Sequence, residues 1–289
     1  MAAADELTPA GAAADPGERA TVIRRSRGWS APDVRELWEY RELLYFLVWR
    51  DVKIRYKQTA IGAAWVLVQP LATAAVFTVV FGRYAKLPSG GAPYAVMVYS
   101  AVLPWLVFAN ALTFSTRSIV EHQALVTKVY VPRLFLPLGA VLAGLVDFAI
   151  GSVLLVVLMA WYGIAPGVQI LLYPLLVVFL VATAAGVTLW LSALNVRYRD
   201  VQYVLPFVMQ VWLFVSPVAY SATLVRSPLA RLFFNLNPMT GVIQGFRWAL
   251  IGSPAPGNYL AISAAIVAIC FVGGLLFFKR MENSFADVI

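Results

Sequence analysis

Six apolar segments of membrane-spanning length constrain the fold of this chain more than any other feature of its sequence. A helix needs about 20 apolar residues to cross the hydrocarbon core of a bilayer. Segments of that length lie at residues 61–82, 94–114, 134–162, 168–194, 203–221 and 258–278. The chain is also 61% hydrophobic and only 12% charged, whereas soluble domains are about 45–50% apolar. The sequence therefore predicts an all-α membrane protein with six transmembrane helices per subunit.

The distribution of positive charge predicts which loops face the cytoplasm. Lys and Arg are enriched in cytoplasmic loops, and with a cytoplasmic N-terminus all but five of the 22 Lys and Arg residues fall in inside segments. The outside segments contain no Asp or Glu, and their five cations are Arg83, Lys86, Arg226, Arg231 and Arg247. Both termini and the segment 115–134 are therefore expected in the cytoplasm, and the net charge of +8 needs no nucleic-acid partner.

Three regions outside the spans complete the expected organisation. Residues 1–32 are rich in Ala, Pro, Gly and Asp and are expected to form a disordered tail. Residues 33–58 mix apolar, aromatic and charged side chains at helical spacing, which predicts an amphipathic helix in the headgroup layer or, alternatively, a solvated helix on another subunit. Residues 59–289 form the transmembrane domain. Within it, residues 222–257 are apolar but interrupted by Pro and Gly, which predicts a pair of short helices in the outer leaflet.

The polar segment 115–134 separates the second and third spans and contains His122, the only histidine of the chain. Its side chains at i, i+4 spacing before Pro132 predict a short amphipathic helix parallel to the membrane. This face consists of Glu121, Leu125, Val126 and Val129. His122 has the chemistry of a proton carrier, but its expected place is on the surface of this helix.

No sequence motif supplies a nucleotide, metal or catalytic site. The phosphate-binding pattern GxxxxGK[ST] is absent, as are HExxH and GxSxG. The single cysteine, Cys270, lies in an apolar run, so neither an intramolecular disulfide nor a Cys-based metal site is expected. An intramembrane enzyme acting on a lipid-linked sugar would need positioned titratable groups near an interface, and this alternative is disfavoured because the outside segments contain no acid.

Asp147 is the only acidic residue within an expected span. An intramembrane carboxylate is by default a functional candidate, yet one acid is a weak basis for ion coupling. Ala140, Gly144, Asp147 and Gly151 also repeat at helical spacing, and such small residues let a neighbouring helix approach and satisfy the acid. The sequence favours this structural role over a functional one and leaves both open.

Four segments in this order resemble the membrane subunit of ABC-2 type polysaccharide exporters, which include permeases for O-antigen, teichoic acid and galactan. The segments are WEYRELLYFLVWRDVKIRYKQTAIGAAWVLVQPL, LVTKVYVPRLFLPL, NVRYRDVQ and NPMTGVIQGFR. The resemblance implies a homodimer in the bacterial inner membrane, driven by two copies of an ABC ATPase subunit that binds ATP and Mg²⁺. The chain itself would bind no cofactor. The implied cargo is a glycan linked to undecaprenyl or polyprenyl diphosphate, exported without catalysis by this chain.

The resemblance also implies roles for residues on the cytoplasmic side. A coupling helix at about 119–133 would dock on the ATPase, with the residues Glu121, His122, Leu125, Val126, Lys128, Val129, Tyr130, Pro132 and Arg133. The helix before the first span would surround the substrate entrance, with the residues Trp38, Tyr40, Arg41, Arg50, Lys53, Arg55 and Lys57. Charge-assisted contacts to a diphosphate and binding of anionic lipid headgroups are equally compatible with these cations.

On the outer side the resemblance implies gate helices in the segment 222–257, with the residues Asn237, Pro238, Gly241, Phe246 and Arg247. Aromatic rings in mid-span are expected along the glycan path, because aromatic faces stack on sugars. These rings are Trp65, Phe77, Trp105, Phe108, Phe207, Trp212 and Phe214. Lipid-facing and interfacial positions are the alternative for each ring. An ABC-2 drug or lipid exporter is the second transporter hypothesis, and the polymer itself is not predicted.

Overall fold

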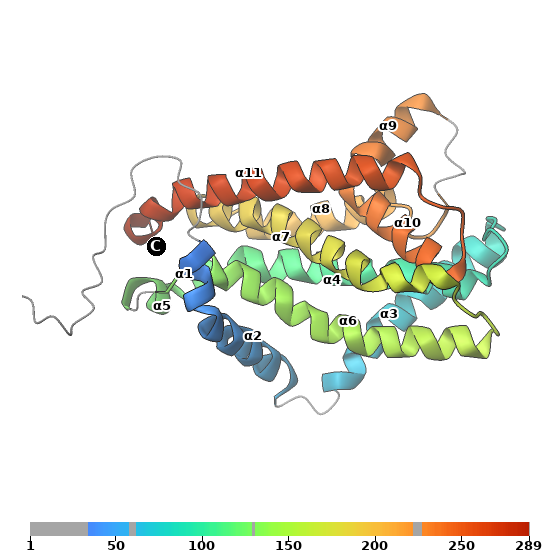
Figure 1. Cartoon of the computed structure of the whole chain (residues 1–289), viewed down its shortest axis with the longest axis horizontal. Helices are drawn as coiled ribbons and strands as arrows, with labels where there is room; N and C mark the ends of the chain where they lie inside the picture. The colour runs from blue at the N-terminus through green and yellow to red at the C-terminus, as the bar shows by residue number, and fades with distance from the viewer. Residues whose placement is uncertain (1–33, 58–61, 129–130, 222–226, 289) are drawn as a thin grey trace, which may run out of the picture.

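The computed structural model describes residues 34–57, 62–128, 131–221 and 227–288, and within these ranges every regular element is helical (Figure 1). The expected tail at residues 1–32 lies outside the described part. The helices are α1 (Val34–Glu39), α2 (Arg41–Tyr56), α3 (Gly62–Phe77), π-helical η1 (Thr78–Tyr84), α4 (Tyr94–Glu121), α5 (Gln123–Lys128), α6 (Phe135–Trp161), 3-10 helix η2 (Val168–Leu172), α7 (Tyr173–Arg197), α8 (Val201–Val215), α9 (Pro228–Leu236), α10 (Pro238–Ile251) and α11 (Asn258–Val288).

Within the described residues, five helices are long and apolar enough to cross a membrane. They are α3 continued by η1, α4, α6, η2 continued by α7, and α11. The fifth expected span, 203–221, differs, because α8 has only 15 residues and would cover about 22 Å as a helix. The helix ends at Val215 because Pro217 follows, and the residue before a proline is pushed to an extended conformation, as Ser216 shows with a ψ of 146°. The chain is therefore a multi-pass membrane protein, with five spans confirmed by length and composition.

Helix α4 is the centre of the bundle. It contacts α3, α6, α7, α8 and α10, and 78% of its most apolar stretch is buried, against 11% for α3 with η1. Tyr99 and Phe108 are fully buried in the core that α4 organises. Because α3 and α8 keep exposed apolar side chains along their length, the single subunit leaves a wide apolar surface uncovered.

Small residues allow close helix contacts at two places. On α6, Gly144 lies against α4, and a Cβ on Gly151 would overlap Leu103 of α4. Helices α7 and α11 meet where a Cβ on Gly274 would lie 2.8 Å from the carbonyl oxygen of Gly186. Because small residues let helices approach within a membrane, the small-residue face of α6 does pack on a neighbouring helix.

The two ends of the bundle carry different elements. Helices α1 and α5 and the C-terminus lie at one end, and α9, α10 and the end of η1 lie at the other (Figure 1). We call them the cytoplasmic end and the outer end, after the orientation that the positive charges predict. Within the segment 222–257, α9 projects from the bundle and exposes Leu232 and Phe233, whereas α10 is almost entirely buried (Figure 1).

Candidate functional site

The segment before the first span packs on α6. It forms α1 and α2 with a turn at Tyr40, and the buried side chains of Leu47 and Val52 mark the packed face of α2. Helices α2 and α6 touch at Gly139 of α6, where a Cβ would lie at an ordinary contact distance of 3.6 Å from the Cβ of Leu47. The aromatic ring of Trp49 stays exposed on α2. A helix with one packed face and one exposed aromatic face suits the headgroup layer.

The residues predicted at the entrance lie on α1 and α2, in the turn between them or directly after α2, and most remain on the surface. Two of the exposed cations lie over aromatic rings, with Arg41 5.2 Å from the ring centre of Trp38 and Lys53 5.5 Å from that of Trp49. These contacts hold long cationic side chains along the helix rather than in the bundle. The exposed members of the set are Trp38, Arg41, Lys53 and Lys57, and the half-buried members are Tyr40, Arg50 and Arg55.

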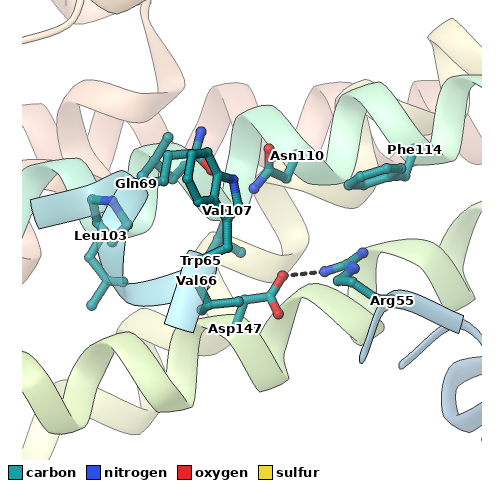
Figure 2. Close-up of a pocket in the computed structure, with 11 residues that line it drawn as sticks. Arg55, Trp65, Val66, Gln69, Leu103, Val107, Asn110, Phe114 and Asp147 are labelled. Carbon is teal, nitrogen blue, oxygen red and sulfur yellow. Dashed lines mark hydrogen bonds and ion pairs between the residues drawn. The ribbon is translucent and has the colours of Figure 1, made fainter. Parts of the chain in front are cut away.

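Arg55 is the entrance residue that turns into the bundle, where it forms an ion pair with Asp147 of α6 (Figure 2). The hydroxyl of Tyr56 donates a hydrogen bond to the same carboxylate, and the guanidinium of Arg55 lies 4.8 Å from the ring centre of Phe114. Burial raises the pKa of Tyr56, and its bond to Asp147 raises the pKa further, so the phenol stays a donor. The acid predicted to be satisfied by helix packing is thus satisfied by two side chains from the end of α2.

A cavity of about 410 Å³ lies beside this pair, between α2, α3, α4 and α6 (Figure 2). Its walls are mostly apolar, with Trp65 on one side. The amide side chains of Gln69 and Asn110 line it, and both lack a hydrogen-bond partner among the described residues. The charges of Arg55 and Asp147 neutralise each other. The cavity can therefore bind a group that hydrogen-bonds to the two amides and packs against the aromatic and aliphatic walls.

A second cavity, of about 370 Å³, extends from Arg55 towards the cytoplasmic end. It shares Arg55 and Phe114 with the first cavity and reaches Glu121 and His122 at the end of α4. The Nε of Arg117 beside it is buried without a hydrogen-bond partner among the described residues. The entrance helix and the end of α4 therefore border the same recess.

The segment predicted as one coupling helix at about 119–133 is divided in the structure. Helix α4 continues through Glu121, and His122 interrupts it, with its Nδ1 2.7 Å from the carbonyl oxygen of Ser118. The short helix α5 follows, and Leu125 is half-buried on it. Pro132 is buried, and the guanidinium of Arg133 donates to the carbonyl of Glu282 in α11. Helix α5 includes Val126 and Lys128, of whose side chains nothing is described, and Val129 and Tyr130 lie outside the described residues.

The aromatic residues predicted along a glycan path differ in burial. Trp65, Phe207 and Phe214 are exposed on α3 and α8 and stay candidates. Trp105 and Phe108 are buried on α4, where their ring centres lie 5.7 Å apart. These two rings fill the core of the subunit and do not face its surface. Trp212 is half-buried against the rings of Trp105 and Phe108. Phe77 is buried, and its ring centre lies 6.5 Å from that of the exposed Phe214.

The residues predicted at the outer gate are buried inside the outer end. The side-chain oxygen of Asn237 accepts hydrogen bonds from the backbone of Met239 and from Trp212 Nε1, and its amide donates to Ser216. Asn237 thus caps α10 and ties it to the end of α8. The set Pro238, Gly241 and Phe246 is buried along α10, where a Cβ on Gly241 would lie 2.5 Å from Ser263 of α11.

The side chain of Arg247 on α10 donates hydrogen bonds to main-chain carbonyls of two neighbouring segments. Its Nε donates to the carbonyl of Met97 at 3.2 Å, its Nη1 to Tyr220 at 3.0 Å and its Nη2 to Val218 at 2.7 Å. The hydroxyl of Tyr94 donates to the carbonyl of Ala219 between them. Two side chains therefore satisfy three consecutive carbonyls of the non-helical segment that follows α8.

Several polar residues of these sites were not predicted. Tyr56 and Tyr94 each bind a partner far away in sequence, which periodicity does not reveal. Gln69 and Asn110 are detectable in the sequence, because an amide side chain inside an apolar span is unusual.

Comparison with known proteins places these features in one family. The family model described as ABC-2 type transporter matches residues 42–251, from the start of α2 to the end of α10. The chain is 29% identical over 259 residues to the O-antigen export system permease protein RfbA of Myxococcus xanthus, covering 89% of this chain and 98% of the relative. It is 24% identical over 249 residues to the protein of that name from Klebsiella pneumoniae, covering 86% and 95%.

The family match covers well over half of the chain and includes the entrance helix, the cavities and the outer end. The chain therefore belongs to the ABC-2 type transporter family.

Proposed function

We propose that this chain is the membrane subunit of an ABC exporter that moves a lipid-diphosphate-linked polysaccharide from the cytoplasmic to the outer side of a bacterial inner membrane. The names of the similar proteins from Myxococcus xanthus and Klebsiella pneumoniae support a polysaccharide of the O-antigen class. ATP and Mg²⁺ belong to a separate ABC ATPase subunit in this proposal. The chain itself contributes the path, the entrance and the surface that receives the ATPase stroke.

The junction of α2 with α6 carries the proposal. The ion pair between Arg55 and Asp147 fixes the end of α2 beside a cavity at membrane depth, while Lys53 and Lys57 remain exposed on the same helix end. A diphosphate at the headgroup level would meet these cations first through charge-assisted contacts. Anionic lipids would occupy the same cations when no cargo is present.

A second copy of the chain would cover the apolar faces of α3 and α8. Phe207 and Phe214 on α8 and Trp65 on α3 are exposed there, and the contact of Phe77 with Phe214 joins the two helices into one surface. A homodimer that pairs these surfaces would line its interface with aromatic rings. Such rings stack on sugars without selecting a single one, which suits a long polymer.

The export activity is tested with the full chain in proteoliposomes, with and without the ABC ATPase subunit that the proposal requires. We expect no ATP hydrolysis by the chain alone, because its sequence has no phosphate-binding loop. With the ATPase, a polyprenyl-diphosphate glycan should move to the outer leaflet, while the carrier lipid without a glycan should move much more slowly. Hydrolysis by the chain alone would contradict the proposal, and equal transport of both lipids would instead indicate a lipid exporter.

The docking role of α5 is tested by Leu125→Glu combined with Val129→Glu. Charges on the proposed apolar contact face should abolish ATP-driven export, while membrane insertion and dimerisation remain unchanged. Ala124→Glu is the matched control, because Ala124 is exposed on the same short helix. Normal export by the double variant would remove α5 from the ATPase contact.

A further inference from the structure

Arg247, at the outer end, is a buried cation without an acidic partner. It is 2% exposed, and its three hydrogen bonds all go to main-chain carbonyls. A guanidinium has five N–H donors, so two of them have no partner among the described residues. Carbonyls satisfy donors without neutralising charge, and a buried charge is costly unless an opposite charge pairs with it.

A small cavity lies directly at this guanidinium. It has a volume of about 80 Å³, and Ser89 and Ser253 line it together with Arg247. Gln244, which precedes Arg247 by three residues on α10, also lines it. The side chain of Gln244 is 9% exposed and has no hydrogen-bond partner among the described residues, and the Oγ of Ser253 is buried without one. Three donor groups without partners among the described residues thus line one cavity.

The charges around the cavity favour an anion. Every cation of the outside segments lacks an acidic counterpart in those segments, because residues 83–93, 162–167 and 216–257 contain no Asp or Glu. A region with charges of one sign and low-dielectric walls raises the local concentration of the opposite charge. Water molecules would fill the volume, but they would leave the charge of the guanidinium uncompensated.

We propose that this cavity binds one phosphate group, held by the guanidinium of Arg247, the amide of Gln244 and the hydroxyl of Ser253. Arginine suits this task because its N–H groups match the oxygens of a phosphate. The phosphate comes either from the lipid diphosphate of a cargo that has reached the outer leaflet or from free inorganic phosphate. The first source rests on the proposed function, whereas the site itself does not.

The test measures binding to the purified full-length chain in detergent micelles by calorimetry. The probes are inorganic phosphate and farnesyl diphosphate, titrated separately. Gln244→Leu should weaken binding of the phosphate group about 10-fold, equivalent to about 1.4 kcal/mol, because it removes one donor and touches none of the three carbonyls. Gln202→Leu is the matched control, since Gln202 lies at the start of α8 near the cytoplasmic end, and it should bind like the unchanged chain.

Two results would support the site and identify its source. Similar affinity for both probes indicates a free phosphate site, and saturable binding of farnesyl diphosphate alone indicates the lipid carrier, provided that Gln244→Leu weakens the binding. Ser253→Ala should lower the same affinity by a smaller factor. Saturable binding that Gln244→Leu leaves unchanged, or no saturable binding of either probe, would overturn the site.

This measurement also separates the inference from the proposed function. Binding is measured without ATPase and without a glycan, so a chain that binds phosphate but exports no glycan contradicts only the proposed function. A chain that exports glycan but binds neither probe contradicts only the phosphate site.

Discussion

Two arginines enter the bundle from opposite ends, and their partners differ in kind. Arg55 at the cytoplasmic end pairs with the carboxylate of Asp147, whereas Arg247 at the outer end donates to three main-chain carbonyls. The ion pair joins two side chains and therefore fixes where α2 docks on α6. The carbonyl contacts join one side chain to the backbone and therefore fix the shape of the chain after α8.

This difference follows from the local backbone. At the cytoplasmic end, α2 and α6 are regular helices whose carbonyls are satisfied internally. At the outer end, Pro217 stops α8, and the carbonyls of the following non-helical segment have no intrahelical partners. Arg247 and Tyr94 supply the missing donors. The outer end should therefore tolerate single substitutions less well than the cytoplasmic end.

The largest effect is expected for Arg247→Leu. The substitution leaves the carbonyls of Val218 and Tyr220 without donors, whereas the carbonyl of Met97 keeps the hydroxyl of Ser100. Each unsatisfied group costs about 1–3 kcal/mol, so we expect destabilisation of about 2–6 kcal/mol, a large fraction of the total stability of a domain. The measurement is the yield of monodisperse protein by size-exclusion chromatography. Arg231→Leu is the control, because Arg231 is exposed on α9 at the same end. Equal yields of the two variants would show that the carbonyl contacts are dispensable.

Asn237→Ala should have the next largest effect. Three groups lose a partner, namely the Met239 N–H at the start of α10, the indole of Trp212 and the hydroxyl of Ser216. Loss of the N-cap alone costs about 1 kcal/mol, and we expect about 3 kcal/mol in total from the buried groups left unpaired. The thermal midpoint in micelles should fall, and Asn237→Asp should recover part of it, because a carboxylate still accepts both hydrogen bonds.

Asp147→Asn tests the cytoplasmic member of the comparison. It leaves Arg55 without its counter-charge, which for a fully buried pair costs about 3–5 kcal/mol. The side chains keep 22% and 14% of their surface, so we expect a smaller loss of about 2 kcal/mol after allowing for that exposure. A cycle with Arg55→Leu and the double variant measures the coupling by thermal unfolding. Additive effects of the two single changes would show that the ion pair contributes nothing.

The sequence predicted the elements better than their partners. Hydropathy located the five long spans because about 20 apolar residues have few alternatives in a bilayer. It overestimated the span at 203–221, because apolar composition continues past Pro217 although the helix does not. The pairing of Arg55 with Asp147 joins positions 92 residues apart. No periodicity encodes such a contact, because tertiary packing decides it.

The aromatic residues show the same limit at the site. Trp65 and Trp105 both lie in the middle of apolar spans, yet the first is 60% exposed and the second 3%. Both tryptophans have apolar neighbours in the sequence. Their exposure differs because α4 is surrounded by other helices whereas α3 lies at the edge. Amide side chains were more informative than the rings. Gln69 and Asn110 stand out in sequence as polar groups in apolar spans and do line the cavity.

The smallest effects, and the sharpest comparison, come from two tyrosines changed to phenylalanine. Each substitution removes one hydroxyl and keeps the ring. Tyr56 donates to the carboxylate of Asp147, and Tyr94 donates to the neutral carbonyl of Ala219. Because hydrogen bonds to charged groups are worth about 1.5–3 kcal/mol and neutral ones about 0.5–1.5 kcal/mol, Tyr56→Phe should destabilise the chain more than Tyr94→Phe, by about 1 kcal/mol.

Which of these two substitutions destabilises the chain more decides whether charged side-chain contacts or backbone hydrogen bonds contribute more to its stability. If Tyr94→Phe lowers the thermal midpoint more than Tyr56→Phe does, leaving the carbonyl of Ala219 without a donor costs more than losing the hydrogen bond to the charged Asp147. Hydrogen bonding of the backbone would then govern stability even for a single bond. Adding Asp147→Asn should shrink the effect of Tyr56→Phe, because its acceptor is then neutral, and should leave the effect of Tyr94→Phe unchanged, because the two sites share no partner. Coupling of Tyr94 to Asp147 would mean that the two ends are not independent.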